Sequence, residues 1–95
     1  LKNFADTGQA LGAALSPDGT RLAFHRMEQG GGDVWMLTLA DNVPRRFTFD
    51  RSQENASPVW SPDGGRLVYR SRHGAKWALV EKPADGAGAE TTLAE

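Results

Sequence analysis

The sequence predicts an all-β protein made of two consecutive four-stranded antiparallel units. Two observations carry this prediction: one motif occurs twice at a fixed spacing, and short strand patterns alternate with turn residues in both halves of the chain. Helices are not expected, because no segment of roughly ten residues keeps the apolar spacing of an amphipathic helix without meeting proline or glycine.

The repeated motif sets the period of the chain. Its two copies are Ser16-Pro17-Asp18-Gly19-Thr20-Arg21-Leu22-Ala23-Phe24 and Ser61-Pro62-Asp63-Gly64-Gly65-Arg66-Leu67-Val68-Tyr69. Subtracting 16 from 61 gives a period of 45 residues, so two periods take up 90 of the 95 residues. Such a period is typical of helical solenoids or of four-stranded propeller blades. Because the strand signals exclude a solenoid, we predict two β-propeller blades, blade 1 at residues 1–50 and blade 2 at residues 51–95.

Each unit contains four expected strands. In the first unit they lie near Ala13–Leu15, Arg21–Arg26, Asp33–Leu39 and Pro44–Phe49. In the second unit they lie near Pro58–Trp60, Arg66–Arg70, Lys76–Glu81 and Glu90–Ala94. The segment from Val34 to Leu39 is nearly continuous in apolar residues, which favours a strand covered on both faces, as stacked blades would provide.

Turn residues separate these strands. In the Ser-Pro-Asp-Gly motif, proline presets φ, aspartate bonds the downstream backbone and glycine accepts a positive φ, so the motif closes a tight hairpin. The structural turn residues are therefore Ser16, Pro17, Asp18, Gly19, Ser61, Pro62, Asp63 and Gly64. We expect the second hairpins at Gly30-Gly31-Gly32 and Arg72-His73-Gly74, and the third at Asp41-Asn42 and Asp85-Gly86.

Both units resemble the PD40, TolB-like β-propeller repeat, a WD40-like unit. The second unit carries the opening of that pattern, Pro58-Val59-Trp60-Ser61-Pro62-Asp63-Gly64, and the first carries its middle, from Gly30 to Trp35 and then Arg46-Phe47-Thr48. The chain departs from the pattern at Leu15, where the opening tryptophan is usual, at Ala78 and Val80, and at Thr91-Thr92-Leu93. The resemblance implies a less regular outer half in the second unit, without the usual bond of an aspartate side chain.

Composition excludes several classes of function. The net charge of −1 suggests neither nucleic acid nor an anionic membrane surface as a partner, and no apolar stretch is long enough for membrane insertion. The absence of cysteine removes disulfides and thiolate chemistry but does not fix the compartment. The first residue is Leu1 and not methionine, so we expect a processed or excised piece of a longer protein. The resemblance favours a periplasmic or other extracytoplasmic location.

Catalysis, cofactors and metal ions are not expected. Ser16 and Ser61 precede proline in a repeated turn, and the chain lacks the Gly-x-Ser-x-Gly elbow of a serine nucleophile. Asp18 and Asp63 lack the alternating oxygen ligands of a calcium loop, and His25 and His73 have no metal-ligand spacing. The sequence therefore predicts no enzyme and no catalytic, cofactor or metal residues.

Aromatic and basic residues are the candidates for packing and for partner contact. Large aromatic side chains fill the space between stacked sheets, so inter-blade packing is assigned to Phe24, Trp35, Phe47, Trp60 and Tyr69. Trp77 has no aromatic counterpart in the first unit and is predicted to face a partner, since subtracting 45 leads to Gly32. The candidate partner-facing residues are Arg45, Arg46, Arg51, Arg70, Arg72, His73 and Trp77.

Two blades cannot close a ring, because propellers hold roughly four to eight of them. We therefore expect the chain either to form a cyclic homo-oligomer, with three copies giving six blades, or to pair with the remaining blades of a parent chain. Three functions stay open: a non-catalytic interaction or sensor scaffold for protein partners, the gating propeller of a prolyl-oligopeptidase-like serine peptidase, and a purely structural minimal or engineered propeller.

Overall fold

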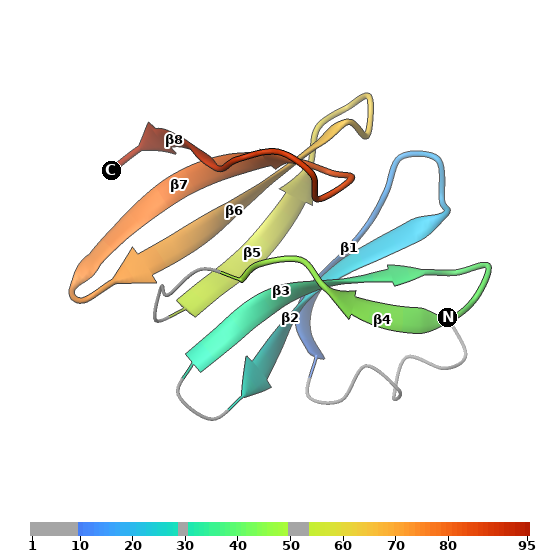
Figure 1. Ribbon diagram of the computed structural model, residues 1–95, viewed down its shortest axis with the longest axis horizontal. Coiled ribbons are helices and arrows are strands. Elements are labelled where there is room, and N and C mark those ends of the chain that lie inside the picture. The colour runs from blue at the N-terminus through green and yellow to red at the C-terminus, as the bar shows by residue number, and fades with distance from the viewer. Residues whose placement is uncertain (1–9, 29–30, 50–53) are drawn as a thin grey trace.

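The computed structural model describes residues 10–28, 31–49 and 54–95, and these residues form eight strands (Figure 1). The strands are β1 (Ala10–Leu15), β2 (Arg21–Glu28), β3 (Gly31–Thr38), β4 (Val43–Arg46), β5 (Glu54–Trp60), β6 (Arg66–His73), β7 (Lys76–Pro83) and β8 (Thr91–Ala94). From here on, blade 1 means β1 to β4 and blade 2 means β5 to β8. The all-β prediction is confirmed.

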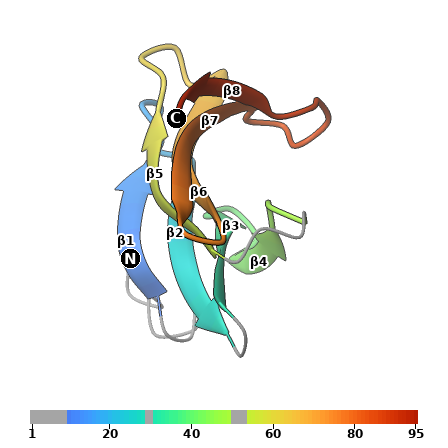
Figure 2. The same ribbon diagram turned by 90° about the vertical axis from the view of Figure 1, so that its left-hand side faces the viewer.

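Each blade is an antiparallel meander in which consecutive strands pair. Among the described residues, one parallel bridge, from Gly32 of β3 to Glu54 of β5, joins the two meanders into one open sheet. Figure 2 places β1 and β5 at the same edge of the molecule and β4 at the opposite edge. The first strands of both blades thus share one edge, as the inner strands of a propeller do.

The 45-residue period holds through the first three strands of each blade. β2 and β6 have the same length at this offset, and so do β3 and β7. The period extends to backbone conformation, since Gly12 and Ser57, at the register shifts of β1 and β5, have φ values of 60° and 58°. The outer strands β4 and β8 do not keep the offset, because β8 begins 48 residues after β4.

Two sequence expectations need correction. The strand expected at Pro44–Phe49 ends at Arg46, because the backbone amides of Phe47 and Thr48 both donate to the carbonyl of Val34 and the chain leaves the sheet edge there. Gly31 and Gly32 belong to β3, and Arg72 and His73 belong to β6, so none of the four is part of a hairpin tip. A Cβ atom at Gly32 would overlap Nε2 of His25, so close packing and not a turn requires glycine at this position.

The main core lies between the blades. Blade 1 contributes Ala23, Val34, Met36 and Phe47, and blade 2 contributes Leu67, Tyr69 and Val80. The rings of Phe47 and Tyr69 meet edge to face with centroids 6.2 Å apart, and the Tyr69 hydroxyl donates to Glu90 over 2.7 Å. Alternate residues of β2 and β3 therefore face blade 2, as the pleat of a strand requires.

A second cluster lies on the opposite face of blade 1. It contains Leu22, Phe24 and Leu37, with Trp35 and Leu39 packed against it. Phe24 and Trp35 therefore do not pack between the two blades of this chain, unlike Phe47, Trp60 and Tyr69. The apolar run of β3 has residues on both faces, which agrees with the expectation of cover on both sides.

Polar contacts also join the blades at the end of β5. The indole Nε1 of Trp60 donates to the carbonyl of Ala14 in β1 over 2.8 Å. The guanidinium of Arg21 lies 4.8 Å from the centre of the Trp60 ring and donates to the carbonyls of Gly64 and Ala84. One tryptophan and one arginine thus tie blade 2 to the first hairpin of blade 1.

Candidate interaction surface

The two Ser-Pro-Asp-Gly motifs form nearly identical turns. In blade 1 the Ser16 hydroxyl donates to Asp18 over 2.7 Å and accepts from the amide of Arg21, while the Asp18 carboxylate accepts from Thr20. Hydrogen bonds from Thr20 and Ser16 lower the pKa of Asp18 to about 2. These side chains are engaged with their own turn, which is the arrangement expected of structural residues.

The second copy of the turn repeats this geometry. The Ser61 hydroxyl donates to Asp63 over 2.8 Å, and the Gly65 amide donates to the same carboxylate over 2.9 Å. These bonds lower the pKa of Asp63, with the Gly65 amide as the larger cause. Gly19 and Gly64 take φ values of 76° and 75°, which only glycine adopts without strain.

Asp33 is the centre of a polar cluster that the repeat alone did not reveal. Its carboxylate accepts from the Thr48 hydroxyl over 2.7 Å, from the Asn55 amide over 3.2 Å and from the Arg46 guanidinium over 2.9 Å. Asn55 belongs to β5, so the cluster connects the two blades. Blade 2 carries Ala78 at this repeat position and lacks the acceptor, as the departure from the PD40 pattern implied.

The predicted partner-facing residues fall into two groups. Arg45 and Arg46 lie on β4. Arg45 forms an ion pair with Asp41 over 2.9 Å, and Arg46 forms one with Asp33 over 2.9 Å. The bond to Arg45 lowers the pKa of Asp41. Both arginines line a hollow of about 360 Å³ beside the Ala84–Gly86 loop. Arg51 lies outside the described residues.

The second group lies on blade 2, where Arg70, Arg72 and Trp77 share the face turned away from blade 1, whereas His73 is one residue out of step with Arg72 in β6 and points to the other face. The guanidinium of Arg70 lies 4.5 Å from the Trp77 ring centre and that of Arg72 lies 5.8 Å from it. Arg72 also pairs with Glu54 over 3.7 Å. Trp77, which was predicted to face a partner, is 36% exposed and is partly covered by the two arginines.

Exposed apolar residues surround this group. Val59 is 60% exposed and Leu79 is 40% exposed. We call the set Val59, Arg66, Val68, Arg70, Trp77 and Leu79 the outer face of blade 2. Val59, Val68 and Leu79 were not predicted from sequence, although their repeat positions give a signal: Leu79 corresponds to Val34, which blade 2 buries completely.

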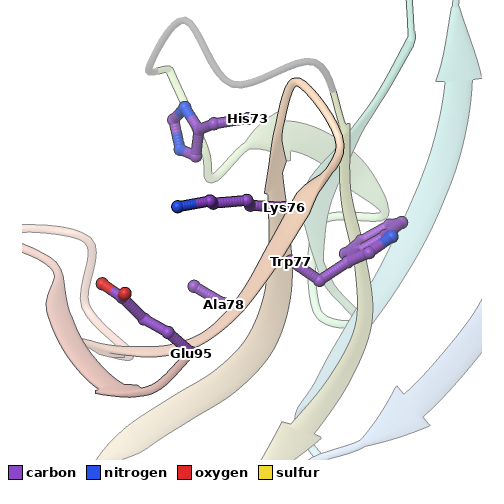
Figure 3. A pocket seen from close by; sticks show the side chains of 5 residues that line it. All are labelled: His73, Lys76, Trp77, Ala78 and Glu95. Atoms are coloured by element: carbon purple, nitrogen blue, oxygen red, sulfur yellow. The ribbon is translucent and has the colours of Figure 1, made fainter.

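A hollow of about 580 Å³ adjoins the β6–β7 hairpin and is lined by His73, Lys76, Trp77, Ala78 and Glu95. In Figure 3 the side chains of His73, Lys76 and Glu95 lie on one side of the hairpin, and the indole of Trp77 points to the other side. Because Ala78 occupies the repeat position of Asp33, the hollow adjoins the blade 2 equivalent of the position from which Asp33 contacts Asn55.

His25 is a buried titratable group between the blades. It is 7% exposed, and its Nε2 lies 3.7 Å from the carboxylate of Glu54. Burial lowers the pKa of His25, although Glu54 and Asp33 act in the opposite direction. A neutral imidazole therefore faces Glu54 at neutral pH.

Among the residues that the structure describes, no three histidine or acidic side chains are placed to hold a metal ion. A helix capable of crossing a membrane is likewise not found in residues 10–28, 31–49 and 54–95.

Curated relatives are Tol-Pal system proteins named TolB, whereas no protein-family model matches the chain. TolB of Mannheimia succiniciproducens is 38% identical over 77 residues, which is 79% of this chain and 18% of that protein. TolB of Hahella chejuensis is 36% identical over 69 residues, which is 70% of this chain and 16% of that protein. The chain thus spans less than a fifth of the length of these relatives.

Solved structures show the same fold. A putative TolB from Agrobacterium tumefaciens superposes with a TM-score of 0.78 and 20% identity, covering 94% of this chain and 32% of that one. The β-propeller domain of the Trilobed protease from Pyrococcus furiosus superposes with a TM-score of 0.71 and 17% identity, covering 90% of this chain and 29% of that one. At these identities the structural similarity establishes the propeller fold and does not indicate a function.

Proposed function

We propose that this chain, a pair of TolB-like β-propeller repeats, is a non-catalytic module that binds protein and forms part of a larger propeller. The proposal includes an extracytoplasmic location, which the resemblance to periplasmic TolB-type proteins supports. The similarity to Tol-Pal system proteins supports protein binding in preference to chemistry.

One observation carries the proposal: equivalent positions in the two blades have opposite exposure. Val34 of blade 1 is fully buried, whereas Leu79, 45 residues later, is 40% exposed. Ala23 is also fully buried, and Val68 at the same offset is only half-buried. Blade 2 itself buries Val34 and Ala23, so a further sheet on the outer face of blade 2 would bury Leu79 and Val68 in the same way.

Two kinds of protein would complete the ring. Copies of this chain would do so as a cyclic assembly, for which three copies and six blades are the prediction from sequence. Further blades of different sequence would do so as well. In both cases the outer face of blade 2 is the contact surface.

Light scattering across a concentration series tests the proposal. We expect the wild-type chain to associate as its concentration rises, because exposed apolar residues on a sheet face drive association. The double variant Val59→Glu/Leu79→Glu is expected to stay monomeric with an unchanged far-UV circular dichroism spectrum. A matched variant on the other group, Arg45→Glu, is expected to behave as wild type. Equal masses for wild type and double variant at every concentration would contradict the proposal.

A further inference from the structure

The contact between the two blades of this chain is a template for the next contact. Because the period of 45 residues holds through β3 and β7, each residue of β1 to β3 that faces blade 2 has an equivalent on the outer face of blade 2. By this offset Arg66 corresponds to Arg21, Arg70 to His25 and Val59 to Ala14. The contact between the blades therefore predicts which side chains a sheet docked on the outer face of blade 2 must contain.

Besides Asn55, which donates to Asp33, and Lys82, which donates to the Phe47 carbonyl, blade 2 offers blade 1 two polar groups from the two ends of β5. The first is Trp60, which donates to the carbonyl of Ala14 and lies under the guanidinium of Arg21. The second is the carboxylate of Glu54, which lies 3.7 Å from the imidazole of His25. A tryptophan at the end of the first strand and an acid at its start thus define the docking edge of a blade.

The outer face of blade 2 has an arginine at the repeat position of each blade 1 residue that makes these contacts, Arg21 and His25. Arg66, at the position of Arg21, is about half exposed and contacts Glu81 over 3.4 Å. Arg70 replaces the neutral His25 with a permanent positive charge and is exposed beside Trp77. A carboxylate would therefore be attracted more strongly here than it is to His25.

Blade 1 lacks both the tryptophan and the acidic residue with which blade 2 makes these contacts. Leu15 occupies the repeat position of Trp60 and has no indole donor, and Gln9 occupies the sequence position of Glu54. The face of blade 1 that a second copy would have to present is also closed, because Leu22, Phe24 and Leu37 are 2%, 0% and 3% exposed. A second copy of this chain thus matches the outer face of blade 2 less well than a blade of the blade 2 type does.

We propose that the outer face of blade 2 receives a blade of the blade 2 type, with tryptophan ending its first strand and an acidic residue starting it, and not blade 1 of another copy. The inference rests on the proposed function and names the partner of the same surface. In the first contact Asp33 accepts from Asn55, but Ala78, at the same repeat position of blade 2, offers no acceptor. The polar selection of a partner at the outer face of blade 2 therefore depends on Arg66 and Arg70.

Two extended chains test the inference. One carries a second copy of residues 51–95 after Glu95, and the other carries a copy of residues 6–50. The natural sequence has no cysteine, so Leu79→Cys places a unique reporter thiol at a 40%-exposed position on the outer face of blade 2. The rate of thiol labelling is measured for the unextended chain and for both extended chains.

We expect the blade 2 copy to slow labelling of Leu79→Cys by roughly tenfold or more, because a docked sheet permits labelling only when it opens. The blade 1 copy is expected to leave the rate within about twofold of that of the unextended chain. Arg66→Met, or leucine in place of the copied tryptophan, is expected to restore fast labelling in the chain extended by blade 2. Far-UV circular dichroism reports whether the added unit forms strands.

The outcomes separate the two proposals. Equal protection by both copies would overturn the selection of a blade 2 type and leave the proposed function standing. No protection by either copy would overturn both proposals, because blade 2 already folds against a blade face in the natural chain and a fitting copy would do the same. Protection by the blade 2 copy that survives Arg66→Met would overturn the role of the arginine contact.

Discussion

Replacing Trp60 with leucine gives blade 2 the residue that blade 1 carries at the same repeat position. The substitution removes the hydrogen bond from Nε1 to the carbonyl of Ala14 and the contact with the Arg21 guanidinium. We expect a loss of about 0.5–1.5 kcal/mol for the hydrogen bond and about 0.5–1 kcal/mol for the cation–π contact. With the lost aromatic area, the free energy of unfolding should fall by about 2–3 kcal/mol.

Urea unfolding measures this effect. For a chain of this size m is roughly 1–2 kcal/mol/M, so the midpoint should move to lower urea by about 1–3 M. Trp77→Leu is the matched control, since Trp77 also stacks with an arginine but is 36% exposed and lies on the outer face of blade 2. It should cost less than about 1 kcal/mol.

A double-mutant cycle then isolates the contact between the blades. Arg21→Met combined with Trp60→Leu should show a coupling energy of about 0.5–1 kcal/mol, because each change removes the same contact. Equal losses for Trp60→Leu and Trp77→Leu, together with a coupling energy near zero, would refute the reasoning that Trp60 joins the two blades.

Three further predictions concern the contact between the blades. Asp33→Ala gives blade 1 the residue that blade 2 carries as Ala78. It should lower the free energy of unfolding by about 1–3 kcal/mol, because Thr48 and Asn55 lose their acceptor. Urea unfolding measures this loss, with the exposed substitution Asp41→Ala as the control. Burial lowers the pKa of His25 from 6.5, so the unfolded chain binds the proton first and stability should fall as pH drops below about 6.5. Unfolding at several pH values should show this slope in wild type and a weaker slope in His25→Phe. Gly32→Ala should cost about 1–3 kcal/mol by thermal unfolding, because its Cβ meets His25, whereas Gly74→Ala meets open space and reports only the cost of positive φ.

Much of the fold could be predicted because its signals are local. Proline, aspartate and glycine in the repeated turns, and short apolar strands between them, act within a few residues along the chain. The strand predictions failed where a distant contact decides: β4 ends early because Val34 accepts from Phe47 and Thr48. The same holds for Gly32, whose role depends on His25 across the hairpin.

The candidate surface was predicted less completely. Trp77 was identified as an unusual member of the repeat and Arg70 and Arg72 as candidate basic residues, and the structure brings the three into one stacked group. Arg45 and Arg46 lie on a different strand and are paired with Asp41 and Asp33. A count of basic residues cannot distinguish a guanidinium held by a carboxylate from one that is left for a partner.

The sequence by itself determined the repeated unit, its period and the turns that close it, because these follow from backbone preferences of neighbouring residues. Only the tertiary structure decided which faces of the blades are covered. Val34 and Leu79 are apolar residues at the same repeat position, yet one is buried and the other is 40% exposed. Burial depends on whether another sheet lies against the face, and that contact is made by residues distant in the sequence.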